Sequence, residues 1–461
     1  MNLLLRDVEV DGRRIDVKVE NGLVAAVGPD LDSSESRVID GAGGALLPGL
    51  HDHHVHLLAL AASLESVQCG PPHVTNLQDL GLALGGSAGE DGWVRGVGYH
   101  ESVAGPLDRR ALDRLVADLP VRVQHRSGSL WMLNSRALDR VGNVLDGSTD
   151  VERDERGEPT GRLWRYDTRL RAALPTTAPN LHEVGRRLHG YGLTGVTDAT
   201  PDLTQGSVDL IAEGVRSRAL RLEVTLLGAR GLDLPPGLRG GPHKLLLRDH
   251  DLPTYDELAG LISTAHAEGT PVAVHCVTRE SLLLTLAVLG DVGVLPGDRI
   301  EHAAVVPHGT ADELARLGVV VVTQPGFLRT RGDAYRRDVS PDDLPCLYPY
   351  DSLRRAGVRV TASSDAPFGE VDPWRIIRNA TERTTAGGEV LGADEVVDAR
   401  TALNGYLTDP LDPAGRRRAV VPGAPADLCL VHAPLAEVLE EPSASQVRLV
   451  VVRGELDPGA G

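Results

Sequence analysis

Four histidines stand within six residues in one segment near the start of the chain. The segment reads Pro48-Gly49-Leu50-His51-Asp52-His53-His54-Val55-His56. Because alternate side chains of an extended strand point the same way, we expect His54 and His56 to project from one face. Two imidazoles at a strand end can form half of a metal site. With 16 histidines in 461 residues, roughly half of one such pair is expected by chance, so the rest of the chain must complete the site.

The middle of the chain alternates short apolar segments with amphipathic ones, which is typical of a parallel α/β sheet or barrel. Residues 255–268, for example, carry apolar side chains at helical spacing. Eight strands in this alternation predict a distorted TIM (β/α)8 barrel. The predicted strands are the segment leading into His54 and residues 195–198, 222–227, 244–247, 272–275, 299–302, 319–324 and 358–365.

A barrel of this kind keeps its catalytic residues at the C-terminal ends of its strands. Imidazoles and a carboxylate occupy those ends here, and a lysine begins the fourth strand. Such ligands suit Zn²⁺, with Mn²⁺, Fe²⁺, Co²⁺ or Ni²⁺ as substitutes, so we predict a divalent metal site with one or two ions. The residues are His54 and His56 on the first strand, Lys244 on the fourth, His275 on the fifth, His302 on the sixth and Asp365 on the eighth.

Both ends of the chain carry short strand-like segments with turn signals such as Asn21-Gly22. We predict a small β-sandwich built from residues 1–46 and 405–461, with the barrel at 47–404. The gap after the first barrel strand is too long for one crossover. We therefore assign about residues 70–180 to an insertion, which in a barrel lies over the site and faces the substrate.

Composition narrows the classes of partner. The chain has 47 basic and 65 acidic residues, a net charge of −18, which argues against nucleic acid or an anionic membrane surface. It shows neither a signal-peptide pattern nor an apolar run of ~18 residues. The four cysteines form no CxxC pair, which favours reduced thiols. We expect a cytoplasmic protein that acts on a small molecule.

Four motifs of the chain are typical of one known family. They are Leu47-Pro48-Gly49 with Asp52-His53-His54-Val55-His56, Pro271-Val272-Ala273-Val274-His275, Arg299-Ile300-Glu301-His302-Ala303 and Ala362-Ser363-Ser364-Asp365-Ala366-Pro367. In these motifs the chain resembles the amidohydrolase superfamily, and within it the branch of N-substituted formamide deformylases. Further similarity in residues 92–96, 159–161, 192–197 and 425–428 extends the resemblance over nearly the whole chain, in the expected order.

This resemblance implies a role for each matching residue. His54 and His56 would bind the more buried metal, and His275 and His302 a second one. Asp365 would hold the metal-activated water and pass its proton to the leaving nitrogen. A bound metal lowers the pKa of water from ~15.7 towards ~7, which supplies hydroxide at neutral pH.

Lys244 has two interpretations. It matches the position of a carboxylated lysine that bridges two metals in many members of the family. The family more often has Asp-Gly closely after this lysine, whereas this chain has Arg248-Asp249-His250. Lys244 could instead pair with a carboxylate such as Asp249, which would leave a single-metal site.

Other residues near the ligands have less defined roles. We expect His51 and His53 to lie outside the ligand pair, with supporting or structural roles. We expect Glu301 to face the helix layer, where it could pair with Arg299.

Substrate contacts are predicted at four positions, for each of which a solvated or structural role is the alternative. They are His125 and Arg126 in the insertion and Gln324 and Arg331 after the seventh strand.

Together these patterns predict an enzyme, an amidohydrolase that cleaves a non-peptide C–N bond in an amide, formamide or cyclic amide. Asp365 would act first as general base and then as general acid. Two alternatives remain: an ester or lactone hydrolase with the same metal site, or a non-catalytic barrel that serves as a binding or scaffold protein. The resemblance also suggests a homodimer.

Overall fold

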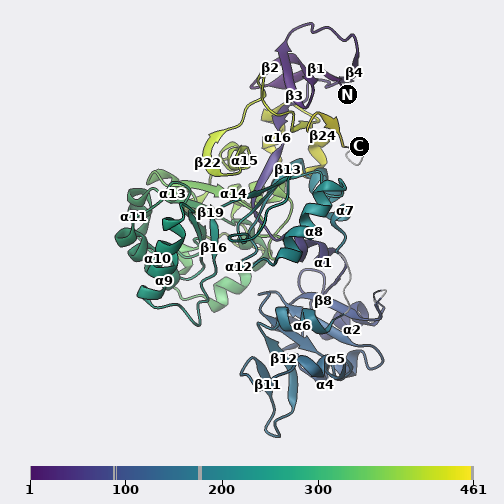
Figure 1. Ribbon diagram of the computed structural model, residues 1–461, viewed down its shortest axis with the longest axis vertical. Coiled ribbons are helices and arrows are strands. Elements are labelled where there is room, and N and C mark those ends of the chain that lie inside the picture. The colour runs from purple at the N-terminus through teal and green to yellow at the C-terminus, as the bar shows by residue number, and fades with distance from the viewer. Residues whose placement is uncertain (1, 87–88, 90, 175–178, 458–461) are drawn as a thin grey trace. The chain divides into compact units, whose positions relative to one another are not determined.

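A computed structural model describes residues 2–86, 89, 91–174 and 179–457 of the chain (Figure 1). It divides into two compact units. The first comprises Met1–Leu58 and Leu181–Gly461, and the second comprises Ala59–Asn180.

Two parallel sheets form the centre of the first unit, with strand orders β15-β14-β13-β6 and β16-β17-β18-β19-β20. Strands lie at all eight predicted positions, and the fourth, β16, is preceded by a short strand, β15, that was not predicted. The strands are β6 (Leu50–Val55), β13 (Leu193–Asp198), β14 (Glu223–Leu226), β15 (Leu238–Gly240), β16 (His243–Leu245), β17 (Val272–Cys276), β18 (Arg299–His302), β19 (Val320–Thr323) and β20 (Arg359–Ala362).

Backbone hydrogen bonds connect these two sheets at both edges. The amide of Asp365 donates to the carbonyl of His54 at 2.8 Å, so the segment after β20 lies beside β6. At the other edge, the amide of Lys244 donates to the carbonyl of Leu227 at 3.0 Å. The result is a mixed α/β fold that is consistent with the predicted TIM-like barrel.

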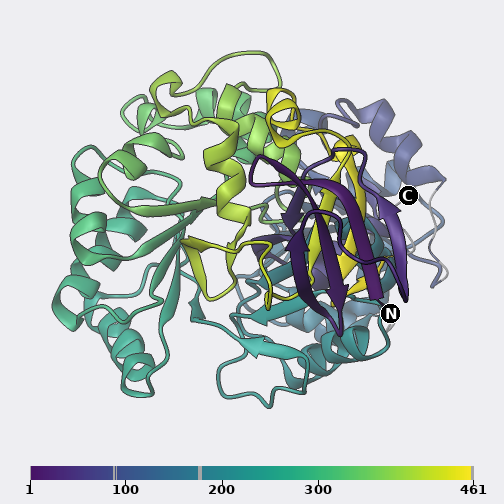
Figure 2. The ribbon, with the colours of Figure 1, turned by 90° about the horizontal axis from the view of Figure 1, so that it is seen from above.

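Helices α9, α10 and α11 lie along one side of the second sheet (Figures 1 and 2). Leu258 of α9 and Leu286 of α10 share a buried core with Val274 of β17 and Ile300 of β18. Such burial of an apolar helix face holds a parallel sheet in place. The helices of this unit are α7 (Leu181–Gly190), α8 (Gln205–Arg216), α9 (Tyr255–Ala267), α10 (Arg279–Val292), α11 (Thr310–Leu317), α12 (Gly326–Asp338), α13 (Asp351–Arg355), α14 (Pro373–Glu382), α15 (Ala399–Tyr406) and α16 (Leu435–Glu440), together with α1 (Leu57–Leu64), which begins in it.

Strands from the two ends of the chain form two further four-stranded sheets, which lie side by side in Figure 2. Leu3 and Val17 share one buried core with Leu428 and Val451. The strands are β1 (Asn2–Val10), β2 (Arg13–Glu20), β3 (Leu23–Gly28) and β4 (Ser36–Asp40) in one sheet, β5 (Leu46–Pro48), β23 (Leu428–Val431), β24 (Val447–Val452) and β25 (Glu455–Leu456) in the other, and the separate pair β21 (Thr408–Asp409) and β22 (Asp412–Arg417).

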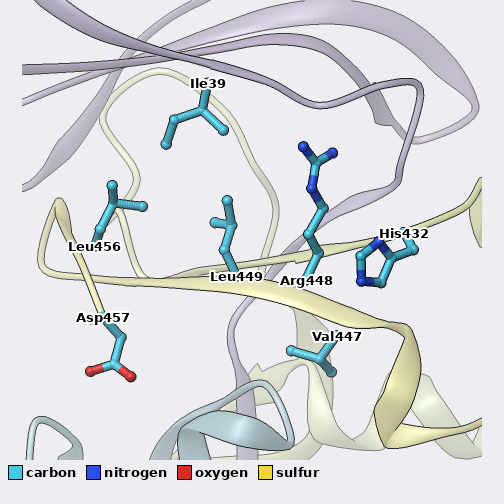
Figure 3. A pocket seen from close by; sticks show the side chains of 7 residues that line it. All are labelled: Ile39, His432, Val447, Arg448, Leu449, Leu456 and Asp457. Atoms are coloured by element: carbon cyan, nitrogen blue, oxygen red, sulfur yellow. The ribbon is translucent and has the colours of Figure 1, made fainter. Parts of the chain in front are cut away.

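A cavity of about 360 Å³ opens on these terminal sheets (Figure 3). Ile39 of β4 faces Leu449 and Leu456 across it, whereas Asp457, the residue after β25, points in the opposite direction. The predicted metal ligands are not among the residues that line it.

The second unit is a six-stranded sheet of order β11-β12-β10-β9-β8-β7 with helices packed on it. The unit has strands and helices of its own. No helix in the described ranges is long and apolar enough to span a membrane. The elements are β7 (Val67–Gln68), α2 (Leu77–Gly85), β8 (Val94–Tyr99), α3 (Glu101–Ala104), α4 (Arg109–Leu115), β9 (Val121–His125), β10 (Leu130–Leu133), α5 (Ser135–Val141), β11 (Val151–Arg153), β12 (Pro159–Trp164) and α6 (Asp167–Ala173).

Candidate metal centre

Three predicted ligands converge at or just beyond the C-terminal ends of β6, β18 and β20. The ligand atoms of His54, His302 and Asp365 lie within 4.8 Å of one another, and all three residues are buried. His54 Nε2 is 3.4 Å from Asp365 Oδ1, and the ring centroids of His54 and His302 are 4.9 Å apart. Two imidazoles and a carboxylate in a buried cluster are donors that suit Zn²⁺ and similar cations.

His56 and His275 lie beside this cluster. His56 Nε2 is 3.1 Å from Asp365 Oδ1, and the ring centroid of His275 is 4.4 Å from that of His302. The structure therefore brings five of the predicted ligands together, with the Asp365 carboxylate next to both His54 and His56.

The protonation states of His275, His302 and Asp365 suit a cation. Burial alone would lower the pKa of His54, but the carboxylates of Glu301 and Asp365 raise it. Burial lowers the pKa of His302 to about 3 and the pKa of His275 well below its ordinary value. Both rings are therefore neutral at pH 7, which is the form that binds a metal. Burial alone would raise the pKa of Asp365, but its contacts with His54 and His56 bring that pKa well below its ordinary value. Asp365 is thus a carboxylate.

Lys244 is 4% exposed, and its Nζ has no hydrogen-bond partner among the described residues. Burial lowers its pKa, because the ammonium loses its hydration there. Lys244 does not pair with Asp249 in this structure, because its Nζ has no hydrogen-bond partner among the described residues, and Asp249 Oδ1 instead accepts a hydrogen bond from Thr278 Oγ1 at 2.7 Å. His54 Nε2 also lacks a hydrogen-bond partner within the described ranges. Buried polar atoms are rarely left without partners, so two such nitrogens fit a site that binds a cation.

Two ligands of the cluster have a left-handed backbone, as does the residue after His302. The φ angles are 72° at His302, 45° at Ala303 and 53° at Asp365. Such conformations are uncommon outside glycine and concentrate at functional sites. At His302 the left-handed turn interrupts the strand alternation, so that Glu301 and His302 both reach the cluster although they are adjacent.

The prediction that Glu301 faces the helix layer is therefore wrong. Glu301 is 0% exposed, and its Oε2 contacts His54 Nδ1. Its other carboxylate oxygen accepts a hydrogen bond from Arg299 Nε, which confirms the expected pairing. Glu301 lies opposite His275 in the parallel register of β17 and β18, and in-register neighbours leave a sheet on the same face.

His302 and His56 also have partners at Nδ1. Gln324 Oε1 lies 2.7 Å from His302 Nδ1, and Thr200 Oγ1 lies 3.0 Å from His56 Nδ1. A hydrogen bond donated by one ring nitrogen leaves the lone pair on the other. Gln324 Oε1 can only accept, so its contact leaves Nε2 of His302 available to a metal, whereas Nε2 of His56 contacts Asp365 Oδ1 in this structure.

The other two histidines of β6, His51 and His53, have hydrogen-bond partners away from the cluster, in agreement with the prediction. His51 Nε2 lies 2.9 Å from Thr197 Oγ1. His53 Nε2 lies 3.0 Å from Thr408 Oγ1 and 3.1 Å from the carbonyl of Gly405.

Of the predicted substrate residues, Gln324 and Arg331 lie near the cluster. Gln324 is 1% exposed, and its amide nitrogen donates to Ser363 Oγ at 2.9 Å and to the carbonyl of Val322 at 3.2 Å. Both the oxygen and the nitrogen of the Gln324 amide therefore already have hydrogen-bond partners within the protein. Arg331 donates to the carbonyl of Phe368 at 2.8 Å, and the ring of Phe368 is 5.3 Å from that of His56.

His125 and Arg126 belong to the second unit. His125 Nε2 is 3.0 Å from Glu101 Oε2, and its Nδ1 is 2.8 Å from Ser127 Oγ. The backbone amide of Arg126 donates to the carbonyl of Tyr99 at 2.8 Å. A role for these two residues in substrate binding stays a prediction.

Three residues of the site were not expected from the sequence. Thr200 carries a weak signal, since it follows a strand end by two residues. Asp52 accepts hydrogen bonds from the amides of His54 at 3.1 Å and Ser364 at 3.2 Å, which connects β6 to the segment after β20. Glu301 is adjacent to a predicted ligand, but alternation counted from His302 assigned it to the wrong face.

Comparison with known proteins gives one family. The profile of the family described as "Amidohydrolase family" matches residues 37–456. The N-substituted formamide deformylase of Arthrobacter pascens is 27% identical over 474 residues, which cover 87% of this chain and 86% of that protein.

Two solved structures have a similar fold. An uncharacterized metal-dependent hydrolase from Pyrococcus horikoshii OT3 gives a TM-score of 0.73 at 20% identity, covering 99% of this chain and 100% of that chain. N-isopropylammelide isopropylaminohydrolase from Burkholderia multivorans ATCC 17616 gives 0.57 at 18% identity, covering 100% and 99%.

Proposed function

Because the chain belongs to the amidohydrolase family, we propose that it is a metal-dependent hydrolase that cleaves a C–N bond in a small non-peptide amide, formamide or cyclic amide. The buried cluster of His54, His302 and Asp365 is the observation that carries this proposal. The Arthrobacter relative, which is named as an N-substituted formamide deformylase, supports formamides as the first substrates to test.

Zinc is the cation that the imidazole and carboxylate donors favour, with one or two ions per chain. A divalent cation lowers the pKa of water and polarises a carbonyl group. Carboxylation of the neutral Lys244 amine by CO₂, with loss of one proton from Nζ, would give an anionic carbamate whose oxygens could bind metal, and with it the site would hold two ions. The proposed ligands are His54, His56, Lys244, His275, His302 and Asp365.

Asp365 performs the proton transfer in this proposal. Its carboxylate accepts a proton from the attacking water while the water oxygen forms a bond to the carbonyl carbon. The same proton then passes to the nitrogen as the C–N bond breaks, which yields a carboxylic acid and an amine. The Nε2 atoms of His54 and His56 lie 3.4 and 3.1 Å from Asp365 Oδ1, so the three side chains would hold the cation together, and the cation would favour the ionised form of the carboxylate.

The architecture proposed for this function is a closed, distorted barrel with a terminal β-sandwich. The hydrogen bonds at both edges of the two parallel sheets support closure. The core shared by the strands of the two termini supports the sandwich. In this proposal the β-sandwich comprises residues 1–46 and 405–461, and the barrel comprises residues 47–404 with an insertion at about 70–180. The protein would be a cytoplasmic homodimer. Light scattering of the purified protein tests the dimer.

The test is a substrate panel combined with metal analysis of protein purified without added metal. N-substituted formamides and cyclic amides are compared with lactones and esters, before and after chelation and restoration of Zn²⁺. We expect amide turnover that disappears on chelation and returns with zinc. Lactone turnover without any amide turnover would reject the proposed reaction. Absence of tightly bound metal, with no activity on metal addition, would favour a binding or scaffold protein.

A further inference from the structure

We propose that Glu301 is a positioning residue that fixes the ring of His54 in the orientation and tautomer that the metal site requires, and that Arg299 holds Glu301 in place. This inference rests on the proposed metal site. It assigns a task to two buried charged residues that the proton-transfer chemistry does not use.

A continuous series of contacts connects β18 to β6. Glu301 is 0% exposed and contacts His54 Nδ1 through Oε2 and Arg299 Nε through Oε1. Arg299 is 2% exposed, and its Nη2 donates to the carbonyl of His53 at 3.0 Å. The guanidinium thus contacts both the carboxylate and the backbone next to the ligand, so the three groups constrain one another.

These contacts determine which ring nitrogen of His54 has a lone pair available to a metal. The carboxylate accepts a hydrogen bond from the N–H at Nδ1, so the lone pair of the neutral ring is on Nε2. Nε2 is the atom that lies 3.4 Å from Asp365 Oδ1 and lacks a hydrogen-bond partner in the described ranges. The tautomer set by Glu301 is therefore the one that presents a lone pair to the cluster.

The partner of His54 differs in charge from those of the other rings. The Nδ1 atoms of His302 and His56 lie against the neutral oxygens of Gln324 and Thr200. An anionic partner makes an imidazole a stronger donor to a metal. Arg299 Nε donates to the other carboxylate oxygen of Glu301, so a cationic guanidinium lies directly beside this anion.

A purely structural ion pair is the competing explanation, and metal binding distinguishes the two. The variant Glu301→Gln keeps an acceptor for His54 but removes the negative charge. Its zinc affinity is measured by competition with a chelator, and the visible spectrum of the Co²⁺-loaded protein reports the ligand geometry. We expect affinity to fall by about 10- to 100-fold and the cobalt bands to shift. The matched control is Glu313→Gln, which removes an exposed carboxylate paired with Arg316 on α11 and should leave both readouts unchanged.

Because Glu301→Gln leaves Arg299 without its anion, it could fail to fold. The double variant Arg299→Gln with Glu301→Gln removes both charges together, and it should still bind zinc about 10- to 100-fold more weakly. A third readout needs no substitution at either position. In zinc-loaded protein with ¹⁵N-labelled histidine, His54, assigned with His54→Ala, should be protonated at Nδ1 and bound through Nε2.

The outcomes separate this inference from the proposed function. If the unmodified protein binds no zinc or cobalt, the proposed function itself fails. If it binds zinc and a folded variant keeps its affinity within twofold with unchanged cobalt bands, the positioning role is overturned. If both variants fail to fold, the nitrogen spectrum decides, and a His54 ring bound through Nδ1 would overturn the inference.

Discussion

Replacement of Gln324 by leucine distinguishes a ligand-orienting residue from a substrate contact. Leucine has nearly the volume of glutamine but cannot accept the hydrogen bond that His302 Nδ1 now makes at 2.7 Å. In Gln324→Leu this buried N–H loses its partner, which costs about 1–3 kcal/mol. At about 1.4 kcal/mol per tenfold change, the loss corresponds to a zinc affinity roughly 5- to 150-fold weaker. This range includes the ~10- to 100-fold effects measured when partners of metal-bound histidines are removed.

The assay for Gln324→Leu is chelator competition for zinc, together with kcat and KM on the best amide of the substrate panel. The matched control is Gln78→Leu, which changes an exposed glutamine on α2 and should alter none of these values. We expect weaker zinc binding, and a KM close to that of the unmodified protein once zinc is saturating. Unchanged zinc affinity with a KM raised tenfold or more would refute this reasoning and return Gln324 to the substrate pocket.

Three further predictions concern His54, Asp365 and Asp372. His54→Ala should lose metal and activity together, whereas the exposed-histidine control His432→Ala should keep both; retained metal with full activity would remove His54 from the ligand set. Asp365→Asn should keep most of the metal while kcat falls by about 10²- to 10⁴-fold, and near-normal turnover would exclude Asp365 from proton transfer. Burial raises the pKa of Asp372 from 3.8 to about 6, so its stabilising contribution is complete below pH ~4 and is lost as the pH rises through about 6. Asp372→Asn should therefore raise the unfolding free energy at pH 7 by about 1–3 kcal/mol and flatten its pH dependence between pH 4 and 6 in urea titrations; an unchanged pH profile would contradict this.

The strands and most ligands could be predicted because both depend on local pattern. Short apolar segments between amphipathic helices indicate buried parallel strands, and polar residues at their ends indicate the catalytic edge. His54, His302 and Asp365 followed from this rule without any knowledge of distance. The second unit could be placed only approximately, because a long insertion with its own sheet has no local signal at its boundaries.

The parts that could not be predicted depend on backbone turns and on register. The left-handed conformation at His302, with a φ of 72°, is a property of the folded chain, and it reverses the face expected for Glu301. The hydrogen bonds of Gln324 depend on where β19 lies relative to β18, which one sequence does not specify. A polar residue after a barrel strand is equally compatible with a substrate contact and with a support for a ligand.

Metal counting in a diffraction experiment tests the central claim most directly. Crystals of protein purified without added metal are measured on both sides of the zinc absorption edge, and the anomalous peaks are located. We predict one or two zinc peaks per chain, within bonding distance of His54, His302 and Asp365, and added density on Lys244 Nζ where there are two. A cluster without any anomalous peak, in protein that also gains no amidase activity on zinc addition, would contradict the account.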